Sequence, residues 1–275
     1  MKEETIEIEK PLELKGQDKE STFIYGEIKV KSTSNVIIRS FTIENLKELD
    51  DDPIYLIEIV DSTNCQIKDN NIKNLHVWAP ALYGLLYLDE SSNNIIQSNN
   101  FKSIGHGIGS GAIPMVNSNE NMIRNNIITN CDGGISIVDG SKNCIYQNTI
   151  ISNYLGVVLS VYKGSGSENK LIANCIQNNE LAGVLIDCDN TLIYCNNIFN
   201  NGYNSWLPFK NTWDLGINNQ WYSDKLKKGN YYGSDYKGED KRYPYGIGDD
   251  PHFIPATSFD YYPLMEVVDI YSIEI

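Results

Sequence analysis

The sequence lacks long apolar runs and is short of basic residues. No segment approaches the ~18 uninterrupted apolar residues of a membrane-spanning helix, so we expect no membrane insertion. Its 275 residues include 22 Lys and Arg against 36 Asp and Glu, for a net charge of −14. Binding to nucleic acid or to anionic lipid depends on clustered Lys and Arg. We therefore expect neither kind of partner.

Signals of several enzyme classes are also missing. There is no glycine-rich phosphate loop, no G-x-S-x-G elbow and no H-E-x-x-H motif. The six cysteines form no C-x-x-C pair, so we expect separate buried thiols rather than disulfides. The first residues have no apolar signal core behind them, so we expect a secretory leader to be absent or already removed.

The residue in excess is asparagine, with 33 copies. Asparagine disfavours helix interiors and ordinary strands, and it favours turns and left-handed backbone. A helical bundle is therefore disfavoured. Disordered asparagine tracts would lack the many Ile, Leu and Val found here, so we expect the asparagines at regular corners of a repetitive fold.

Alignment of the chain with itself shows a repeat of 22–29 residues, a period suited to a solenoid. Seven apolar anchors mark it: Ile43, Ile72, Phe101, Ile127, Ile150, Ile176 and Ile198. Two residues before the anchor stand Phe41, Asn70, Asn99, Asn125, Asn148, Asn174 and Asn196. Eight residues before it stand Asn35, Asn64, Asn93, Asn119, Lys142, Glu168 and Asn190. An apolar column beside two Asn-rich columns predicts coils stacked in register.

A second strand in the unit opens with glycine, at Gly84, Gly134, Gly156 and Gly183. We expect each glycine to supply a positive-φ corner before a strand with one inward face. The unit therefore comprises a strand, an Asn turn, a strand, a loop, a glycine and a strand. This order suits one turn of a parallel β-helix, with identical positions about 4.8 Å apart. Stacked asparagines would form a hydrogen-bonded ladder.

These motifs carry a family resemblance. The pattern of Asn143-Cys-Ile-Tyr-Gln-Asn-Thr-Ile resembles the β-helix repeat of the carbohydrate-binding and sugar hydrolysis (CASH) group. Three stretches near the C-terminus resemble the closing signature of NosD-like proteins: Gly229-Asn-Tyr-Tyr-Gly-Ser-Asp-Tyr, Gly246-Ile-Gly-Asp and Asp260-Tyr-Tyr-Pro-Leu-Met. The resemblance implies an all-β, right-handed parallel β-helix and an extracellular or periplasmic location.

We expect two parts in the chain. Residues 1–202 would form a parallel β-helix of about eight coils. Residues 203–275, where the Asn–Ile repeat stops and aromatic residues accumulate, would form a C-terminal capping segment whose rings pack over the last coil.

We expect no cofactor. In NosD-like proteins the stretch before Gly-Ile-Gly-Asp is often rich in aspartate and resembles a calcium loop. Here Asp240 is followed by Lys241-Arg242-Tyr243-Pro244-Tyr245, which replaces the alternating oxygen ligands that calcium needs. The usual calcium loop is therefore degraded in this chain, and a calcium ion bound there is the alternative to no cofactor.

Chemically versatile residues gather in loops after the anchors. The loops of the early coils are longer than the later ones, and in stacked coils such insertions project on one side and often mark the binding face. They bring His76 and His106 to neighbouring coils, and a shorter loop brings Asp132. These three are candidate catalytic residues for acid–base chemistry on a glycan. As metal ligands they have suitable types but no fixed spacing, so we predict no metal site.

Aromatic residues lie in the same loops. Trp78, Tyr83 and Tyr154 are candidate substrate-binding residues, because such rings stack on sugar faces. All of these residues could equally be solvated loop residues that serve only the fold.

Three functions stay open from the sequence. The resemblance favours a non-catalytic module that binds carbohydrate or another surface ligand. The alternative is a polysaccharide-active enzyme (lyase, hydrolase or epimerase) with its groove under the early-coil loops. The third is a structural or adhesin-like element of a cell surface. Ligand identity and oligomeric state lie beyond the sequence.

Overall fold

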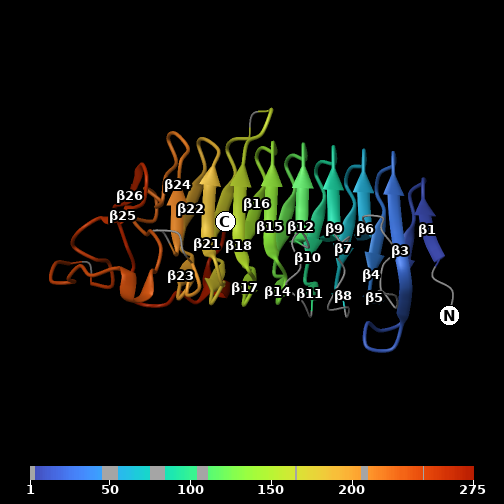
Figure 1. The fold of residues 1–275 in the computed structure, drawn as a ribbon, viewed down its shortest axis with the longest axis horizontal. Helices are drawn as coiled ribbons and strands as arrows, with labels where there is room; N and C mark the ends of the chain where they lie inside the picture. The colour runs from blue at the N-terminus through green and yellow to red at the C-terminus, as the bar shows by residue number, and fades with distance from the viewer. Residues whose placement is uncertain are drawn as a thin grey trace.

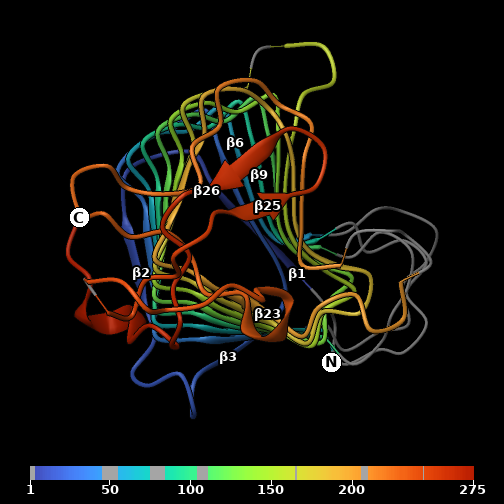
Figure 2. The same cartoon turned by 90° about the vertical axis from the view of Figure 1, so that its left-hand side faces the viewer.

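The computed structural model describes residues 4–44, 55–74, 84–103, 111–164, 166–205, 210–243 and 245–275. They form a right-handed parallel β-helix, as expected, whose coils stack along one axis from the N-terminal to the C-terminal end (Figure 1). Viewed down the axis, the strands enclose a three-sided section (Figure 2). We call the three sides sheets A, B and C.

Each coil contributes one short strand to each side, and all pairs between coils are parallel. Sheet A contains β1 (Glu4–Ile8), the second half of β3 (Phe23–Lys31), β6 (Tyr55–Val60), β9 (Gly84–Asp89), β12 (Gly111–Val116), β15 (Gly133–Val138), β18 (Leu155–Ser160), β21 (Ala182–Asp187) and β24 (Thr212–Asp214). Sheet B contains β2 (Glu13–Lys15), β4 (Ile37–Arg39), β7 (Gln66–Lys68), β10 (Ile95–Gln97), β13 (Met122–Arg124), β16 (Cys144–Tyr146), β19 (Lys170–Ile172) and β22 (Leu192–Tyr194). Sheet C contains the first half of β3, β5 (Thr42–Glu44), β8 (Asn71–Asn74), β11 (Asn100–Ser103), β14 (Ile127–Thr129), β17 (Thr149–Ile151), β20 (Cys175–Gln177) and β23 (Asn197–Phe199).

The core is a stack of inward Ile, Leu and Val side chains, because alternate residues of each strand point into the solenoid. Six of the seven predicted anchors stack as expected. The fourth anchor was wrong by one residue: Ile128 pairs with Phe101 and Ile150, whereas Ile127 is 48% exposed. The doublets Asn125-Asn126 and Ile127-Ile128 fit the repeat in either register, and stacking against the neighbouring coils selects one of them.

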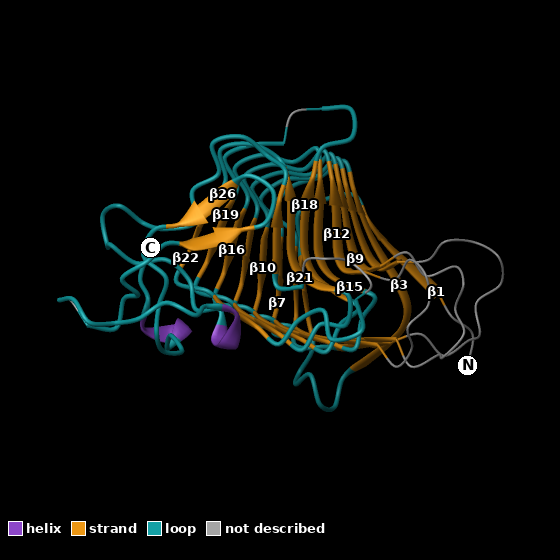
Figure 3. Cartoon of the chain, turned by 60° about the vertical axis from the view of Figure 1, so that its left-hand side comes forward, coloured by secondary structure: helices purple, strands orange, loops and turns teal. Residues whose placement is uncertain are grey.

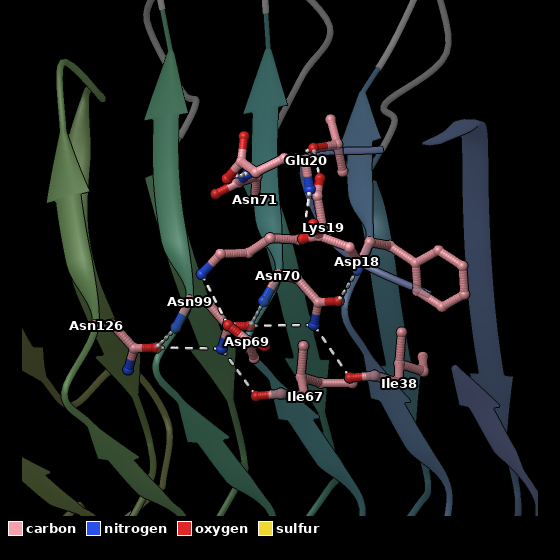
Figure 4. Close-up of polar contacts among 12 residues, drawn as sticks. Asp18, Lys19, Glu20, Ile38, Ile67, Asp69, Asn70, Asn71, Asn99 and Asn126 are labelled. Atoms are coloured by element: carbon pink, nitrogen blue, oxygen red, sulfur yellow. Dashed lines mark hydrogen bonds and ion pairs between the residues drawn. The ribbon is translucent and has the colours of Figure 1, made fainter. Parts of the chain in front are cut away.

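The predicted asparagine ladder runs along the corner between sheets B and C. Its rungs are Asn70, Asn99, Asn126, Asn148, Asn174, Asn196 and Asn230. The backbone N–H and the side-chain amide of each rung donate to the Oδ1 atom of the next, as for Asn70 on Asn99 at 3.0 and 3.1 Å (Figure 4). The amide of Asn70 also donates to the carbonyl oxygen of Ile38 at 3.0 Å. The buried corner backbone is thereby satisfied without water.

Two further ladders lie at the other corners. One contains Asn94, Asn121, Asn143 and Asn169, and beyond Thr191 it continues with Asn219. The other contains Asn153, Asn179, Asn201 and Asn211. The predicted column eight residues before the anchor is not a ladder. It holds outward residues with positive φ, such as Asn93 at 60°, one position before the ladder residue.

The strand-opening glycines are not positive-φ corners, which corrects our expectation. The described glycines with positive φ are Gly26, Gly202, Gly233 and Gly246. A Cβ on Gly134 would instead lie 2.3 Å from the carbonyl oxygen of Gly156. Glycine is required there because the backbones of adjacent coils approach closely.

All three ladders end on aspartate. The last amides donate to Asp214, Asp260 and Asp235, from Asn219, Asn230 and Asn211 respectively. Every rung donates toward the C-terminal end, so the final rung needs a group that only accepts. A carboxyl oxygen accepts the hydrogen bond in each case.

The C-terminal part covers the end of the stack, as predicted for the aromatic cap. Trp221 and Tyr232 are fully buried there, and the hairpin of β25 (His252–Ile254) and β26 (Ser258–Asp260) lies across the opening (Figure 2). Stacking continues past residue 202, where we expected the cap to begin, because β24 pairs with β21. The two short 3-10 helices, η1 (Gly233–Asp235) and η2 (Ile270–Ser272), also belong to this end (Figure 3).

The six cysteines are all free. Four are buried and two, Cys144 and Cys175, are half-buried. Burial raises the pKa of each thiol, to about 12 for Cys131. They are neutral packing side chains, as predicted.

Candidate functional site

The outer face of sheet A carries an aromatic and apolar column along the solenoid axis. Outward residues of successive strands stand in register there: Lys29, Glu58, Tyr87, Pro114, Ser136, Val158, Leu185 and Trp213. The strands place these side chains about 4.8 Å apart. A linear ligand on this face would therefore meet one outward side chain per coil at a regular spacing.

Two tyrosines form a platform near the N-terminal end of this face. The rings of Tyr55 and Tyr87 are stacked, with centroids 4.3 Å apart and planes 11° from parallel. Burial, together with the charge of Asp89, raises the pKa of Tyr87 above its usual range. The phenol is therefore neutral and keeps its proton for hydrogen bonding.

Acidic residues flank the platform. Lys29 lies 3.2 Å from Glu27 and 3.8 Å from Glu58, measured between the ammonium nitrogen and the nearest carboxylate oxygen. Burial opposes the charge of Lys29, yet the hydrogen bond to Glu27 and the charge of Glu58 raise its pKa. The N-terminal part of this face is thus a compensated ion cluster with a net negative charge.

An apolar pocket occupies the other end of the face. It has a volume of about 360 Å³, and its walls include Val158, Leu185, Trp213 and Leu215, with Asp187 at the side. Leu215 is 52% exposed. An indole and aliphatic side chains on an open surface form a site that can receive the apolar face of a sugar ring.

Two of the six predicted site residues come together at the corner between sheets C and A. Asp132 precedes β15 and Tyr154 precedes β18, so the two stack on adjacent coils. The Tyr154 N–H donates to the carbonyl oxygen of Cys131 at 2.9 Å, and the Leu155 N–H to that of Asp132 at 2.8 Å. Tyr154 is 37% exposed, so its ring is accessible beside the sheet A column.

The other four predicted residues are His76, Trp78, Tyr83 and His106. They lie outside the described residues. Their convergence with Asp132 stays a prediction. In the sequence, these residues fall between β8 and β9 and between β11 and β12.

Sequence reasoning missed the outward residues of sheet A. We recognised the strand that begins at Gly84 but used only its inward positions, so Tyr87 was not considered. Its partner Tyr55 comes from the preceding coil. We had assigned Trp213 to the cap, but it lies in β24. The alternation of inward and outward residues was the available signal, and it becomes useful only once the register is known.

Comparison with known proteins places this architecture in a family. The NosD family, described as periplasmic copper-binding protein, matches residues 17–238. The chain belongs to the NosD family. A cell surface glycoprotein of Methanothermus fervidus is 34% identical over 130 residues, which is 44% of this NosD-like chain and 22% of the glycoprotein. The chain therefore matches less than a quarter of that relative's length.

Solved structures share the fold at low sequence identity. An exopolygalacturonase from Thermotoga maritima superposes with a TM-score of 0.55 at 13% identity, over 76% of this chain and 50% of the enzyme. The Dettilon tailspike protein gives 0.53 at 13% identity, over 84% of this chain and 53% of the tailspike. Both similarities are of the β-helix fold alone.

The described residues of this NosD-like chain do not fit a copper site. They contain no group of three or more His, Cys, Asp or Glu side chains placed to hold a metal ion. The described histidine, His252, packs its ring 4.0 Å from that of Tyr232. Burial lowers the pKa of His252 to about 4. We therefore derive no chemistry through copper.

The loop that replaces the calcium-type sequence is held by its own backbone. The N–H groups of Lys241 and Arg242 donate to the two carboxylate oxygens of Asp249, at 2.9 and 3.1 Å. The Gly246 N–H donates to Asp240 at 2.7 Å. Backbone donors thus occupy both carboxylate oxygens of Asp249 and one of the two of Asp240.

In the described ranges, no helix combines the length and the hydropathy needed to cross a bilayer.

Proposed function

We propose that this chain is a non-catalytic, carbohydrate-binding β-helix module whose binding surface is the outer face of sheet A. The observation that carries the proposal is the in-register column with the Tyr55–Tyr87 platform at one end and the Trp213 pocket at the other. Aromatic faces and aliphatic walls suit the C–H faces of sugar rings. The acidic flank of Glu27 and Glu58 favours an uncharged glycan over an anionic one.

The setting supports this function. The family is described as periplasmic, and the matched relative is a cell surface glycoprotein. We infer an extracellular or periplasmic location, where polysaccharide is the prevalent polymer. The accessible corner residues Asp132 and Tyr154 would extend the surface beside the column.

A glycan array followed by calorimetry tests the proposal. We expect the protein to bind neutral polysaccharides and Trp213→Ala to weaken the binding at least tenfold, because the pocket loses its largest wall. Tyr87→Ala should have a smaller effect in the same direction. Tyr162→Ala is the matched control, because Tyr162 is an aromatic residue 77% exposed on a loop away from this column.

Three outcomes would change the assignment. Absence of binding to any neutral glycan, or equal affinities for Trp213→Ala and Tyr162→Ala, would reject the sheet A site. Release of shortened sugars from a bound polysaccharide would replace the binding role with the enzymatic alternative.

A further inference from the structure

The outer face of sheet B carries a row of basic side chains that the proposed function does not use. In five successive coils one outward column contains, in register, Lys15, Arg39, Lys68, Gln97 and Arg124. Two of the chain's three arginines stand in it. Four cations at one register position are notable in a protein of net charge −14, because they concentrate positive potential on one strip of an acidic surface.

The row keeps most of its charge. Arg39 is ion-paired with Glu13, and among the described residues this is the one ion pair recorded for the row. Asp69, the residue after Lys68, is paired with Lys19 at 2.7 Å instead (Figure 4). The row's positive field lowers the pKa of Glu13, chiefly through the hydrogen bond from Arg39 and also through Lys15 and Lys68.

Two cations of the row are held in place by neighbouring glutamines. Arg124 donates to the Oε1 atom of Gln97 from its Nε and Nη2 atoms, at 2.9 and 2.6 Å. The Lys68 ammonium donates to the Oε1 atom of Gln66 at 3.1 Å. A neutral amide orients each of these two cations without cancelling its charge. A planar guanidinium fixed in this way retains free N–H donors for a carboxylate.

A column of three apolar residues and one glutamine borders the row. The adjacent outward position of sheet B holds Ile37, Gln66, Ile95 and Met122, all half-buried. The face is thus amphipathic across its width, with cations along one line and C–H surface along the next. This combination fits a polymer that has both carboxylates and sugar rings.

The C-terminal tail packs against the corner between sheets B and C, beside this face. Tail residues beyond Met265 leave the cap and run back along the outside of later coils, on the side of the section that carries β2 (Figure 2). Asn197 exchanges two hydrogen bonds of 2.8 Å with the backbone of Val268. The Gln147 amide donates to the carbonyl oxygens of Ile270 and Ile273, at 2.9 and 3.1 Å.

The tail reaches the coil next to Arg124, at the C-terminal end of the basic row. The Tyr146 hydroxyl donates to the carbonyl oxygen of Ile273, and Tyr146 is the register partner of Arg124 on the next coil. The charges of Glu274 and Arg124 both act on Tyr146. The tail, which includes η2 and carries Asp269 and Glu274, therefore covers the corner between sheets B and C and the adjoining edge of sheet B as far as the coil next to Arg124. The strip from Lys15 to Arg124 lies on the coils beyond it.

We infer that this strip of sheet B binds a linear anionic polysaccharide, whose uronate-type carboxylates pair with Arg39, Lys68 and Arg124. The chain would lie along the solenoid axis. A nucleic acid is disfavoured, because its phosphates are far denser than the four cations can neutralise and the rest of the surface repels it. The site is on a different face from sheet A and does not depend on it.

Affinity electrophoresis in gels containing sodium polygalacturonate tests the inference. We expect the wild-type protein to be retarded at low salt and the retardation to fall as salt rises. The double variant Arg39→Gln/Arg124→Gln should bind at least tenfold more weakly. The matched control, Lys163→Gln/Lys225→Gln, removes the same charge from exposed lysines elsewhere and should bind like the wild type. Thermal melting confirms that each variant is folded.

Further measurements show whether the strip is independent of sheet A and which polymer it prefers. Trp213→Ala should leave polygalacturonate binding unchanged, so that failure of the sheet A proposal can be told apart from failure of this one. No retardation of the wild type, or equal loss in the double variant and its control, would overturn the inference. Tighter binding to poly-L-glutamate or to a single-stranded DNA oligonucleotide would reassign the strip to an acidic peptide or a nucleic acid.

Discussion

The corner between sheets B and C contains two adjacent residues per coil that differ sharply in how much variation the chain tolerates. The inward one is Asn in seven coils, from Asn70 to Asn230. The outward one precedes it and, in the seven coils from Ser40 to Cys195, has a positive φ between 53° and 63°. It is Ser40, Asp69, Ser98, Asn125, Gln147, Ala173 or Cys195.

The difference separates two reasons for a polar corner. The inward position needs a donor and an acceptor on one buried side chain, and only an amide of that length satisfies both neighbours. The outward position needs only a backbone that can enter the left-handed region, at a cost of roughly 1–2 kcal/mol for residues with a Cβ. The stack makes that cost tolerable, so six residue types occur there.

The largest effect should come from breaking the inward column. In Asn126→Ala the N–H of Asn99 loses its acceptor at 2.9 Å, and the carbonyl of Ile96 loses its donor. Unsatisfied buried groups cost about 1–3 kcal/mol each, so we expect a loss of about 3–5 kcal/mol in unfolding free energy. Asn125→Ala, at the outward position of the same corner, should cost about 1 kcal/mol.

Urea denaturation of the two variants measures this difference. Equal losses for Asn125→Ala and Asn126→Ala would contradict the distinction between a hydrogen-bonding column and a conformational one.

The next largest effect concerns two adjacent glycines at the corner between sheets C and A. One of them should tolerate substitution by alanine and the other should not. A Cβ at Gly134 would meet the carbonyl oxygen of Gly156 at 2.3 Å, whereas one at Gly133 has nothing nearer than 3.5 Å. We expect Gly134→Ala to cost about 2–3 kcal/mol through overpacking and Gly133→Ala to be near neutral. Thermal unfolding tests it, and a stable Gly134→Ala variant would show that the coils can separate.

A third effect is the pH dependence of stability, because the ladder of neutral asparagines ends on a titratable carboxyl group, Asp260. Asp260 accepts hydrogen bonds from the N–H groups of Asn230 and Tyr262 at 2.7 and 2.9 Å. Burial nevertheless raises the pKa of Asp260 from 3.8 to about 7. The folded state then keeps a proton that the unfolded chain loses, so this contribution to stability is full below pH 4 and is lost as pH rises through 7.

His252 acts in the opposite direction. Burial lowers its pKa from 6.5 to about 4, so its contribution is full above pH 6.5 and is lost as pH falls toward 4. The two windows overlap between about pH 4 and 6.5 with opposite signs, so the variants are needed to separate the groups. In melting temperatures measured from pH 4.5 to 8.5, we expect Asp260→Asn to leave a curve that rises with pH up to about 6.5, and His252→Gln to leave a curve that falls with pH up to about 7. Curves parallel to the wild type would contradict both assignments.

The same two columns explain how far the sequence could be interpreted. The period, the anchors and the ladder at Asn70 or Asn148 follow from residues that must be alike in every coil. The anchor was predicted at Ile127 instead of Ile128 because these two neighbouring residues are identical. The ladder that begins at Asn94 was missed because its outward neighbour Asn93 is also asparagine.

The binding faces were less accessible to sequence reasoning, for a physical reason. Outward residues such as Tyr87 or Arg124 obey no repeat, because solvent imposes no common requirement on them. Their grouping into a column exists only after the register is fixed. Asp132 and Tyr154 were found because they lie at a loop position that the repeat itself defines.

The smallest expected effect tests the outward column alone. Ser98 has φ of 56°, so Ser98→Gly relieves strain at the cost of a more flexible unfolded chain. We expect a net gain of about 0.5 kcal/mol in unfolding free energy, measured by urea denaturation. Asn99→Gly, one residue later, should lose several kcal/mol because it removes the rung. If Ser98→Gly were destabilising by more than about 1 kcal/mol, its hydroxyl would have a role beyond backbone conformation, and the outward column would no longer be purely conformational.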